Sequence, residues 1–333
     1  MGVISVGSAE NAVYPAQNAT VSTGYGPITY LNWKAFTSGT YPLYALTTDP
    51  SVTNDACTIP AGTPNLAGYL VVVRRGGCSL QQKAQNLFNQ GATMMFAVNT
   101  PGAVPLYQTF SFGIKFAFIS DNDGNYLLQQ IASGANTTVT FSFAPTTLPN
   151  IYTGNTTSFF SEIGPSNDLY MAASVLAPGT NIISILPTAL GNWSLTEGTS
   201  QACAFAAGAA ALYLNAKGAV NVSPKTVREA FEFSATQLPV SVSDSTLESV
   251  AAQGAGKIQI YDAINAATVV SPTELLLNDT AYFQSLQYIT VYNSGSSTVS
   301  YKLSNVPAGT ALAFQSVSRN AAQIMPSAEN DRG

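Results

Sequence analysis

The chain has 333 residues, of which 46% are hydrophobic and only 9% are charged. This length predicts two or three domains, and the Ser, Thr, Asn and Gly that replace charged residues are common in secreted microbial proteins. With a net charge of −5 and no runs of Lys or Arg, nucleic-acid and anionic-membrane binding are not expected, and no apolar run reaches the ~20 residues that span a bilayer.

From about residue 20 to residue 143 the pattern alternates strands with helices. Residues 70–73 read as a buried strand, and Ser79 can cap the helix that follows, with Gly91 as its stop. The apolar face of that helix contains Leu80, Ala84, Leu87 and Phe88. Further strands are predicted over 94–98, 116–119 and 139–143, with a helix through 127–131. Asp121 and Asp123 lack the ligand spacing of an EF-hand loop, so helix capping is preferred over calcium binding.

The character of the chain changes after Pro149. Short strands are predicted over 171–176 and 182–186, and an alanine-rich helix over 201–215 ends near Gly218. Ser223 and Pro224 form a second helix start, with serine as the cap and proline at the first helical position. A short helix through Ala263 and Ile264 follows a glycine-rich turn at 253–256.

After Ser271-Pro272 the pattern is all β. Strands are predicted over 274–277, 288–292 and 299–303, with a turn at 293–296. Residues from about Ser327 are polar, and we expect them to be disordered.

Gly198-Thr199-Ser200 directly precedes the alanine-rich helix. A serine in the first turn of a helix lies beside unpaired backbone N–H groups and the positive end of the helix dipole, which suits a nucleophile that develops an oxyanion next to it. Three small residues also adjoin by chance, and for this motif taken alone an ordinary helix cap is the preferred explanation. Small residues after Ser200 allow the helix to pack closely against a sheet; they are Ala202, Ala206, Ala207, Gly208, Ala210 and Ala211.

The usual proton acceptor for such a serine is absent, because the chain contains no histidine. Glu197, Lys217 and Lys225 are substitutes with little support, and Cys203 is expected to be a packed small hydrophobe rather than a second nucleophile. Without histidine and with scattered cysteines there is no evident set of zinc ligands, so neither a metal nor a cofactor is expected.

Two resemblances organise these motifs. The order of strands and helices over about 120 residues, with Cys57 before the first strand and Arg75-Gly76-Gly77-Cys78-Ser79 after it, resembles a protease-associated (PA) domain. That resemblance implies a Cys57–Cys78 disulfide, with two unpaired buried thiols as the alternative. The later motifs resemble the C-terminal third of subtilisin-like serine peptidases: Phe160-Ser161, Ala177-Pro178-Gly179, Gly198-Thr199-Ser200, Ser223-Pro224 and Gly254-Ala255-Gly256.

The resemblance implies an α/β fold: a partial subtilisin-like parallel-sheet core with an inserted PA (α+β) domain and the start of a C-terminal β-sandwich. The expected domains are a remnant strand of the catalytic core at 1–14, the PA-like domain at 15–147, the later catalytic part at 148–270, an incomplete fibronectin III-like sandwich at 271–326, and a tail at 327–333. Gln201 and Ala204 depart from the methionine and proline that the family usually has there.

By resemblance, Ser200 is the catalytic nucleophile, supported by Gly198 and Thr199, while the catalytic aspartate, histidine and oxyanion asparagine are missing. Asn11 receives no role. The expected function is that of a secreted serine endopeptidase in N-terminally truncated form, inactive alone, with protein or peptide substrates and the missing N-terminal half as a partner. The alternative is a non-catalytic PA-domain interaction module. An extracellular location makes glycosylation possible at Asn18, Asn136, Asn155, Asn192 and Asn278, whereas Pro224 weakens the motif at Asn221.

Overall fold

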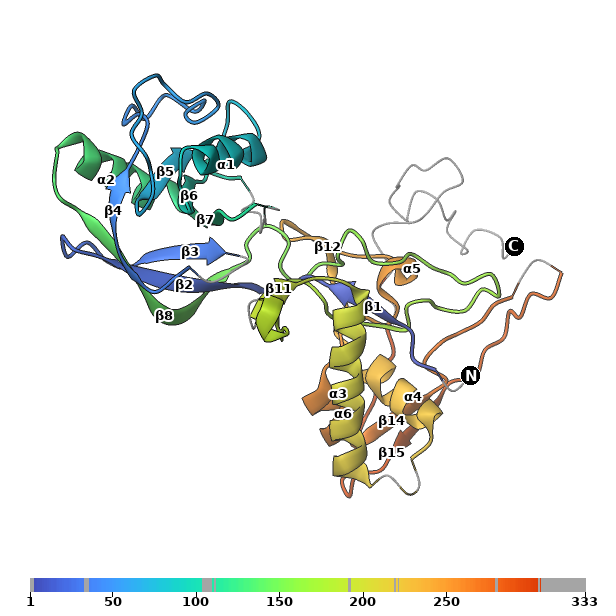
Figure 1. Cartoon of the computed structure of the whole chain (residues 1–333). Helices are drawn as coiled ribbons and strands as arrows, with labels where there is room; N and C mark the ends of the chain where they lie inside the picture. The colour runs from blue at the N-terminus through green and yellow to red at the C-terminus, as the bar shows by residue number, and fades with distance from the viewer. Residues whose placement is uncertain are drawn as a thin grey trace. The chain divides into compact units, whose positions relative to one another are not determined.

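The computed structural model describes residues 3–32, 36–103, 110, 112–190, 193–218, 220, 222–278, 281–304 and 306. The chain forms two compact units, each labelled by its elements in Figure 1. One unit, here called the barrel unit, comprises Val13–Pro149 and Ile183–Leu195. The other, the serine unit, comprises Met1–Ala12, Asn150–Ile182 and Thr196–Gly333.

The barrel unit is built on seven strands that close in the order β2-β3-β7-β6-β5-β4-β8. The strands are β2 (Val13–Val21), β3 (Ile28–Asn32), β4 (Gly39–Tyr44), β5 (Leu70–Arg74), β6 (Met94–Val98), β7 (Lys115–Ile119) and β8 (Thr138–Pro149). β5, β6 and β7 run parallel, and nearly all of their residues are buried. This burial explains their continuous apolar sequences, which correctly predicted three strands.

Two apolar cores stabilise the barrel unit. Inside the barrel, the rings of Tyr30, Phe36, Phe96 and Phe141 contact one another at centroid distances of 4.7–5.7 Å. The other core includes the buried face of helix α1 (Leu80–Asn89), where Ala84 and Leu87 have no exposed surface. Phe88 was wrongly assigned to that face, because 38% of its surface is exposed.

Serine caps begin both helices of this unit, as expected for α1. Ser79 Oγ accepts a hydrogen bond from the Gln82 N–H at 3.1 Å. At α2 (Asp121–Ala132), Ser120 Oγ accepts from the Asp123 N–H at 3.1 Å, and the Asp123 carboxylate accepts from the Ser120 hydroxyl at 2.7 Å. Asp123 therefore serves the helix start, in keeping with the capping role preferred over calcium binding.

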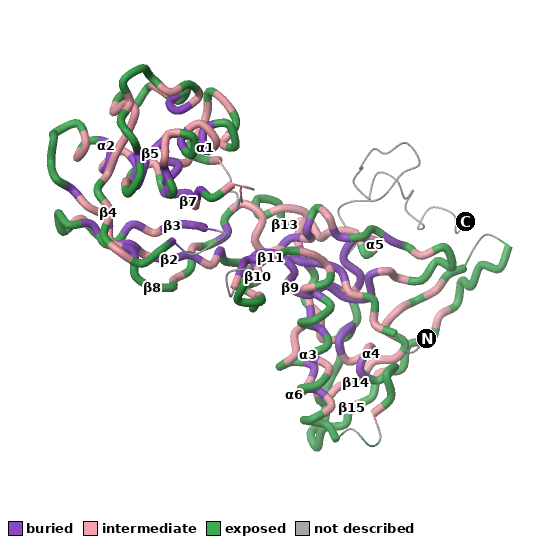
Figure 2. Tube along the Cα trace, in the orientation of Figure 1, coloured by how far each residue is buried: buried purple, intermediate pink, exposed green. Residues whose placement is uncertain are grey.

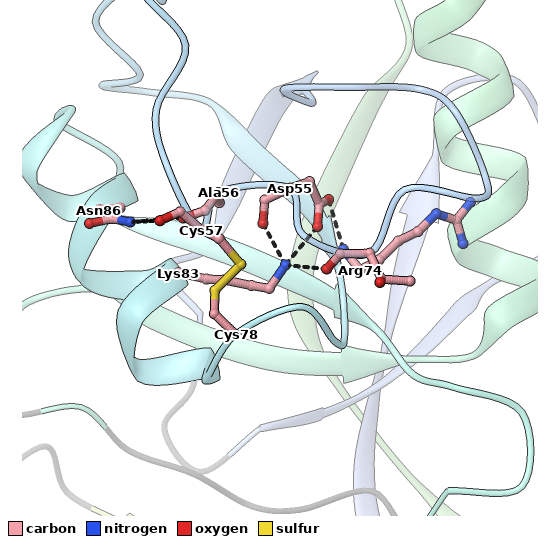
Figure 3. A network of polar contacts seen from close by, with 8 residues as sticks. Asp55, Ala56, Cys57, Arg74, Cys78, Lys83 and Asn86 are labelled. Atoms are coloured by element: carbon pink, nitrogen blue, oxygen red, sulfur yellow. Dashed lines mark hydrogen bonds and ion pairs between the residues drawn. A yellow bond between two sulfur atoms is a disulfide. The ribbon is translucent and has the colours of Figure 1, made fainter.

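A buried ion pair attaches the 53–57 loop to α1, and a disulfide attaches it to the segment just before that helix (Figure 3). Lys83 Nζ lies 2.7 Å from Asp55 Oδ1, and both side chains are almost fully buried. The same ammonium group donates to the carbonyls of Thr53 and Asp55. Two residues after Asp55, Cys57 forms the disulfide with Cys78 that the PA resemblance implied. The loop is thus fixed at both Asp55 and Cys57.

The serine unit is built around a parallel pair of strands and a long helix. β1 (Val6–Ala9) pairs with β9 (Val175–Pro178), and among the described residues β1 has no other strand partner. The helix is α3 (Thr199–Lys217), which ends before Gly218 as predicted. Helices α4 (Pro224–Ser234), capped by Ser223, and α6 (Ile260–Asn265) complete the core, in which Phe231 is fully buried.

Only one face of α3 is buried, as its alternating colours in Figure 2 show. Ala202, Ala206, Ala209 and Tyr213 form that face. The helix is apolar all round, however, and its exposed residues include Cys203, Ala204, Phe205, Ala207, Gly208, Ala211 and Leu212. The expectations that Cys203 is packed and that Ala207, Gly208 and Ala211 lie against a sheet were therefore wrong.

The remaining strands are short and differ in part from prediction. They are β10 (Ile182–Ile185) with β11 (Trp193–Thr196), β12 (Pro239–Ser241) with β13 (Asp244–Leu247), and β14 (Thr268–Ser271) with β15 (Thr290–Asn293). The 3-10 helix η1 spans Thr188–Leu190 and α5 spans Val250–Gln253. Residues 171–174, 274–277 and 299–303 are not strands. β-branched and apolar composition predicted them, but no partner strand pairs with them in the described chain. The tail at 327–333 lies outside the described residues.

Replacing Lys83 with methionine should destabilise the barrel unit by about 3–5 kcal/mol, because the substitution leaves Asp55 buried without its counter-charge. Urea unfolding followed by circular dichroism measures this loss. Lys225→Met is the matched control, since Lys225 is 65% exposed and lies 3.6 Å from Glu229, where an ion pair contributes less than about 1 kcal/mol. Equal losses in the two variants would contradict the structural role of the buried pair.

Removing the disulfide by Cys57→Ser with Cys78→Ser should cost about 3 kcal/mol, because the bond closes a loop with a sequence separation of 21 residues. The same unfolding experiment reports this value. Cys203 is free and exposed, so Cys203→Ser should leave the unfolding midpoint unchanged. A disulfide-free chain with the wild-type midpoint would rule out this stabilisation.

Candidate active site

Ser200 is the second residue of α3, and its side chain is exposed. The N–H groups of Gln201 and Ala202 donate to the carbonyl of Gly198 at 3.2 and 3.3 Å, which forms the first turn of the helix. The N–H groups of Thr199 and Ser200 precede these two, at positions that have no acceptor within the helix, and they face the N-terminal end where the dipole is positive. The hydroxyl of Ser200 is therefore accessible beside an environment that stabilises negative charge.

Two glycines set the position of the helix start relative to the β1–β9 pair. The N–H of Gly198 donates to the carbonyl of Gly179 at 2.8 Å, and the N–H of Gly179 donates to the carbonyl of Ala9 at 3.1 Å. A Cβ on Gly179 would lie 2.3 Å from Ser8 Oγ and 2.8 Å from the Gly198 carbonyl oxygen. Gly198 has φ of 149°, which favours glycine. The close approach therefore requires glycine at position 179, and the backbone conformation favours glycine at position 198.

Buried hydroxyls hold the carboxyl end of β1. Ser8 is fully buried, its Oγ lies 2.8 Å from Ser158 Oγ, and its N–H donates to Ser161 Oγ at 3.0 Å. The N–H of Ser158 in turn donates to the carbonyl of Ser8 at 3.0 Å. These bonds satisfy the polar groups at the end of the strand that adjoins Gly179, so the hydroxyls support the site rather than take part in chemistry.

A second polar cluster lies immediately after β1. Glu10 Oε2 accepts hydrogen bonds from the hydroxyls of Thr153 and Thr180 at 3.1 and 3.2 Å. Asn11 donates from its backbone N–H to Thr180 Oγ1 at 3.0 Å and from Nδ2 to the Thr180 carbonyl at 2.8 Å. The amide of Asn11 is therefore used to anchor the segment after β9, consistent with giving it no oxyanion role.

None of the substitute bases forms a hydrogen bond to Ser200 in the described structure. Glu197 is exposed, and Lys225 pairs with Glu229 on α4. Lys217 lies 17 residues along α3 from Ser200, a separation of about 25 Å at the helical rise. Burial lowers the pKa of Lys257, but its Nζ donates to Asn155 Oδ1 at 2.5 Å.

Among the residues that the structure describes, no group of three or more His, Cys, Asp or Glu side chains is positioned to bind a metal ion. Within the same residues, no helix is both long enough and apolar enough to cross a membrane.

The glycosylation candidates differ in accessibility. Asn136 and Asn278 are exposed. Asn18 and Asn155 are half-buried, and their side-chain oxygens accept hydrogen bonds from Thr29 and Lys257. Asn192 lies outside the described residues. The two exposed sites are therefore the more accessible acceptors.

The sequence suggested Ser200, Gly198 and the Gly179 motif as candidate site residues, but it gave no indication of the contacts of Ser8 and Glu10. Their partners lie 143–170 residues away in the chain. The only local signal was the cluster of hydroxyl and carboxylate residues at the end of a predicted strand. Such a cluster indicates that polar side chains form hydrogen bonds there, but it does not predict which distant residues are their partners.

Comparison with known proteins identifies relatives of this chain. The profile of the Subtilase family matches residues 1–256. The minor extracellular protease Vpr of Bacillus subtilis is 30% identical over 215 residues, which cover 62% of this chain and 25% of Vpr. The PI-type proteinase of Lactococcus lactis subsp. cremoris is 27% identical over 220 residues, which cover 63% of this chain and 12% of that proteinase.

Among solved structures, the subtilisin-like protease Apa1 of the Antarctic psychrotroph Pseudoalteromonas sp. AS-11 overlaps with 77% of this chain and 50% of its own, at 15% identity and a TM-score of 0.32. A score this low supports no conclusion about the fold. The chain spans a quarter or less of the curated relatives above. Because the family profile matches well over half of the residues, the chain belongs to the subtilase family.

Proposed function

We propose that this chain supplies the nucleophile-bearing part of a secreted subtilisin-like serine endopeptidase. The observation that carries the proposal is the exposed hydroxyl of Ser200 in the first turn of α3, within the segment that matches the subtilase profile. Gly198 and Thr199 shape the turn that presents this hydroxyl. The substrates are proteins or peptides.

The reaction follows from this geometry. Ser200 Oγ attacks the carbonyl carbon of a peptide bond while its proton passes to a base, and the carbonyl oxygen becomes an oxyanion beside the N–H groups at the start of α3. The amine leaves with a proton, and an acyl-enzyme remains on Ser200. Water then attacks the ester carbonyl, and its proton returns through the same base to Ser200 Oγ.

The base has to come from outside these 333 residues, because they contain no histidine. Loss of the base from such a triad lowers kcat about 10⁶-fold. We therefore propose that the catalytic aspartate and histidine lie in further polypeptide, and that the chain alone is inactive. Such a polypeptide would pack on the exposed apolar face of α3.

The proposed domain plan places a PA domain at 15–147 between catalytic parts at 1–14 and 148–270, with the start of a β-sandwich at 271–326. The closed barrel with helices α1 and α2 supports the first assignment, as does the Cys57–Cys78 bond. The β14–β15 pair is the only described strand pairing that bears on the sandwich. A disulfide also favours an oxidising, extracellular location, where glycosylation is proposed at the exposed Asn136 and Asn278.

A fluorophosphonate probe should label Ser200 when imidazole is added as a soluble proton acceptor, because the hydroxyl is accessible and imidazole replaces the missing base. Peptide mapping by mass spectrometry locates the adduct. Ser223 is an internal control, since it is also exposed at a helix start but caps α4 by accepting from the Thr226 N–H. Ser200→Ala should abolish the imidazole-dependent adduct.

Labelling spread equally over Ser200 and Ser223 would contradict the nucleophile assignment. Casein hydrolysis by the chain without imidazole, if lost in Ser200→Ala, would show instead that a base is present and would overturn the proposal of inactivity.

The wild-type chain should self-associate through the exposed face of α3, because apolar side chains there lie on successive turns. Phe205 and Leu212 are 46% and 57% exposed. Phe205→Gln with Leu212→Gln should shift the sedimentation profile toward monomer. Phe159→Gln is the matched control, since Phe159 is 93% exposed but lies off α3. A wild-type chain that sediments as a monomer at micromolar concentration would contradict this expectation.

A further inference from the structure

A pocket of about 140 Å³ lies within the barrel unit. It opens where the paired strands β2 and β8 meet residues of the β10–β11 pair. Its lining consists of Pro15, Ala16, Gln17, Asn32, Phe143, Pro145, Ile183, Trp193 and Leu195. The mechanism proposed for Ser200 uses none of these residues.

The pocket has a buried floor and an accessible rim. Ala16, Gln17, Asn32 and Leu195 are each at most 6% exposed and form the floor. Phe143 and Ile183 on the rim are 76% and 59% exposed. Exposed large apolar side chains that surround a recess are typical of an interaction site.

Size and polarity restrict the ligand. A cavity of about 150 Å³ with an apolar lining holds one benzene molecule, so this pocket has room for a single aromatic ring. None of the lining residues is charged, and burying a charge without a partner is strongly unfavourable. The rings of Phe143 and Trp193 can make offset or edge-to-face contacts with a third ring.

We propose that this pocket binds one aromatic side chain of a polypeptide, separately from the Ser200 site. The recess is open at a rim that includes the exposed side chains of Phe143 and Ile183, which leaves room for the peptide backbone that carries the ring. Because a member of the subtilase family is proposed here to act on polypeptides, the pocket provides a way to retain a substrate or product through residues other than Ser200 and its helix start.

Selectivity should follow the burial of the ring. A decapeptide of alanine and serine with one central phenylalanine should bind about 10- to 100-fold more tightly than the same peptide with alanine at that position. Peptides with central lysine or glutamate should bind no better than the alanine peptide, because their charges would lose water without gaining a partner.

The test is fluorescence anisotropy with these four dye-labelled peptides and the full 333-residue chain. Ile183→Ala removes rim surface and should weaken the phenylalanine peptide about fivefold. Ile185→Ala is the matched control, since Ile185 is on the same strand, is 89% exposed and does not line the pocket. Trp193→Ala should weaken binding tenfold or more, with circular dichroism confirming that the variant is folded.

Equal affinity for the phenylalanine and alanine peptides, or equal effects of Ile183→Ala and Ile185→Ala, would overturn the proposal. Ser200→Ala should bind the phenylalanine peptide as the wild type does. A failure of the pocket therefore leaves the assignment of Ser200 untouched, and a failure of Ser200 labelling leaves the pocket untouched.

Discussion

The position of Ser200 depends on the hydrogen bond between the N–H of Gly198 and the carbonyl of Gly179. This bond connects the helix that carries the serine with the segment that follows β9. Through Gly179 and Ala9 the connection extends to the end of β1, where Ser8 forms hydrogen bonds with Ser158 and Ser161. A nucleophile is useful only if its position is fixed to within a fraction of an ångström, and here backbone bonds to a paired strand fix it.

Much of the barrel unit could be predicted from sequence, because its signals are local. The continuous apolar runs at 70–73 and 94–98, and the serine cap of α1, act within a few residues. Closure of the barrel could not be predicted this way. It joins β2 to β8 and β3 to β7 across about a hundred residues, and periodicity contains no information about pairing. The Lys83–Asp55 pair was missed for the same reason.

In the serine unit, sequence reasoning located the candidate nucleophile and misjudged what surrounds it. The small residues of α3 correctly indicated close packing at Ala202 and Ala206, but a helix that is apolar all round does not reveal which faces have partners. Cys203 is consequently exposed where packing was expected. The predicted strands at 274–277 and 299–303 show the same limit, since β propensity requires a partner strand to take effect.

The direct test of this arrangement is the rate of imidazole-dependent phosphonylation of Ser200 in Gly179→Ala, compared with Gly208→Ala. A Cβ at 179 would meet Ser8 Oγ and the Gly198 carbonyl, whereas a Cβ at 208 meets nothing within 4 Å. We expect Gly179→Ala to lose at least about tenfold in rate while Gly208→Ala retains the wild-type rate, since misplacing a reacting group by about 1 Å costs up to 10²-fold. Equal rates in the two variants would show that the contact between Gly179 and Gly198 does not position the serine.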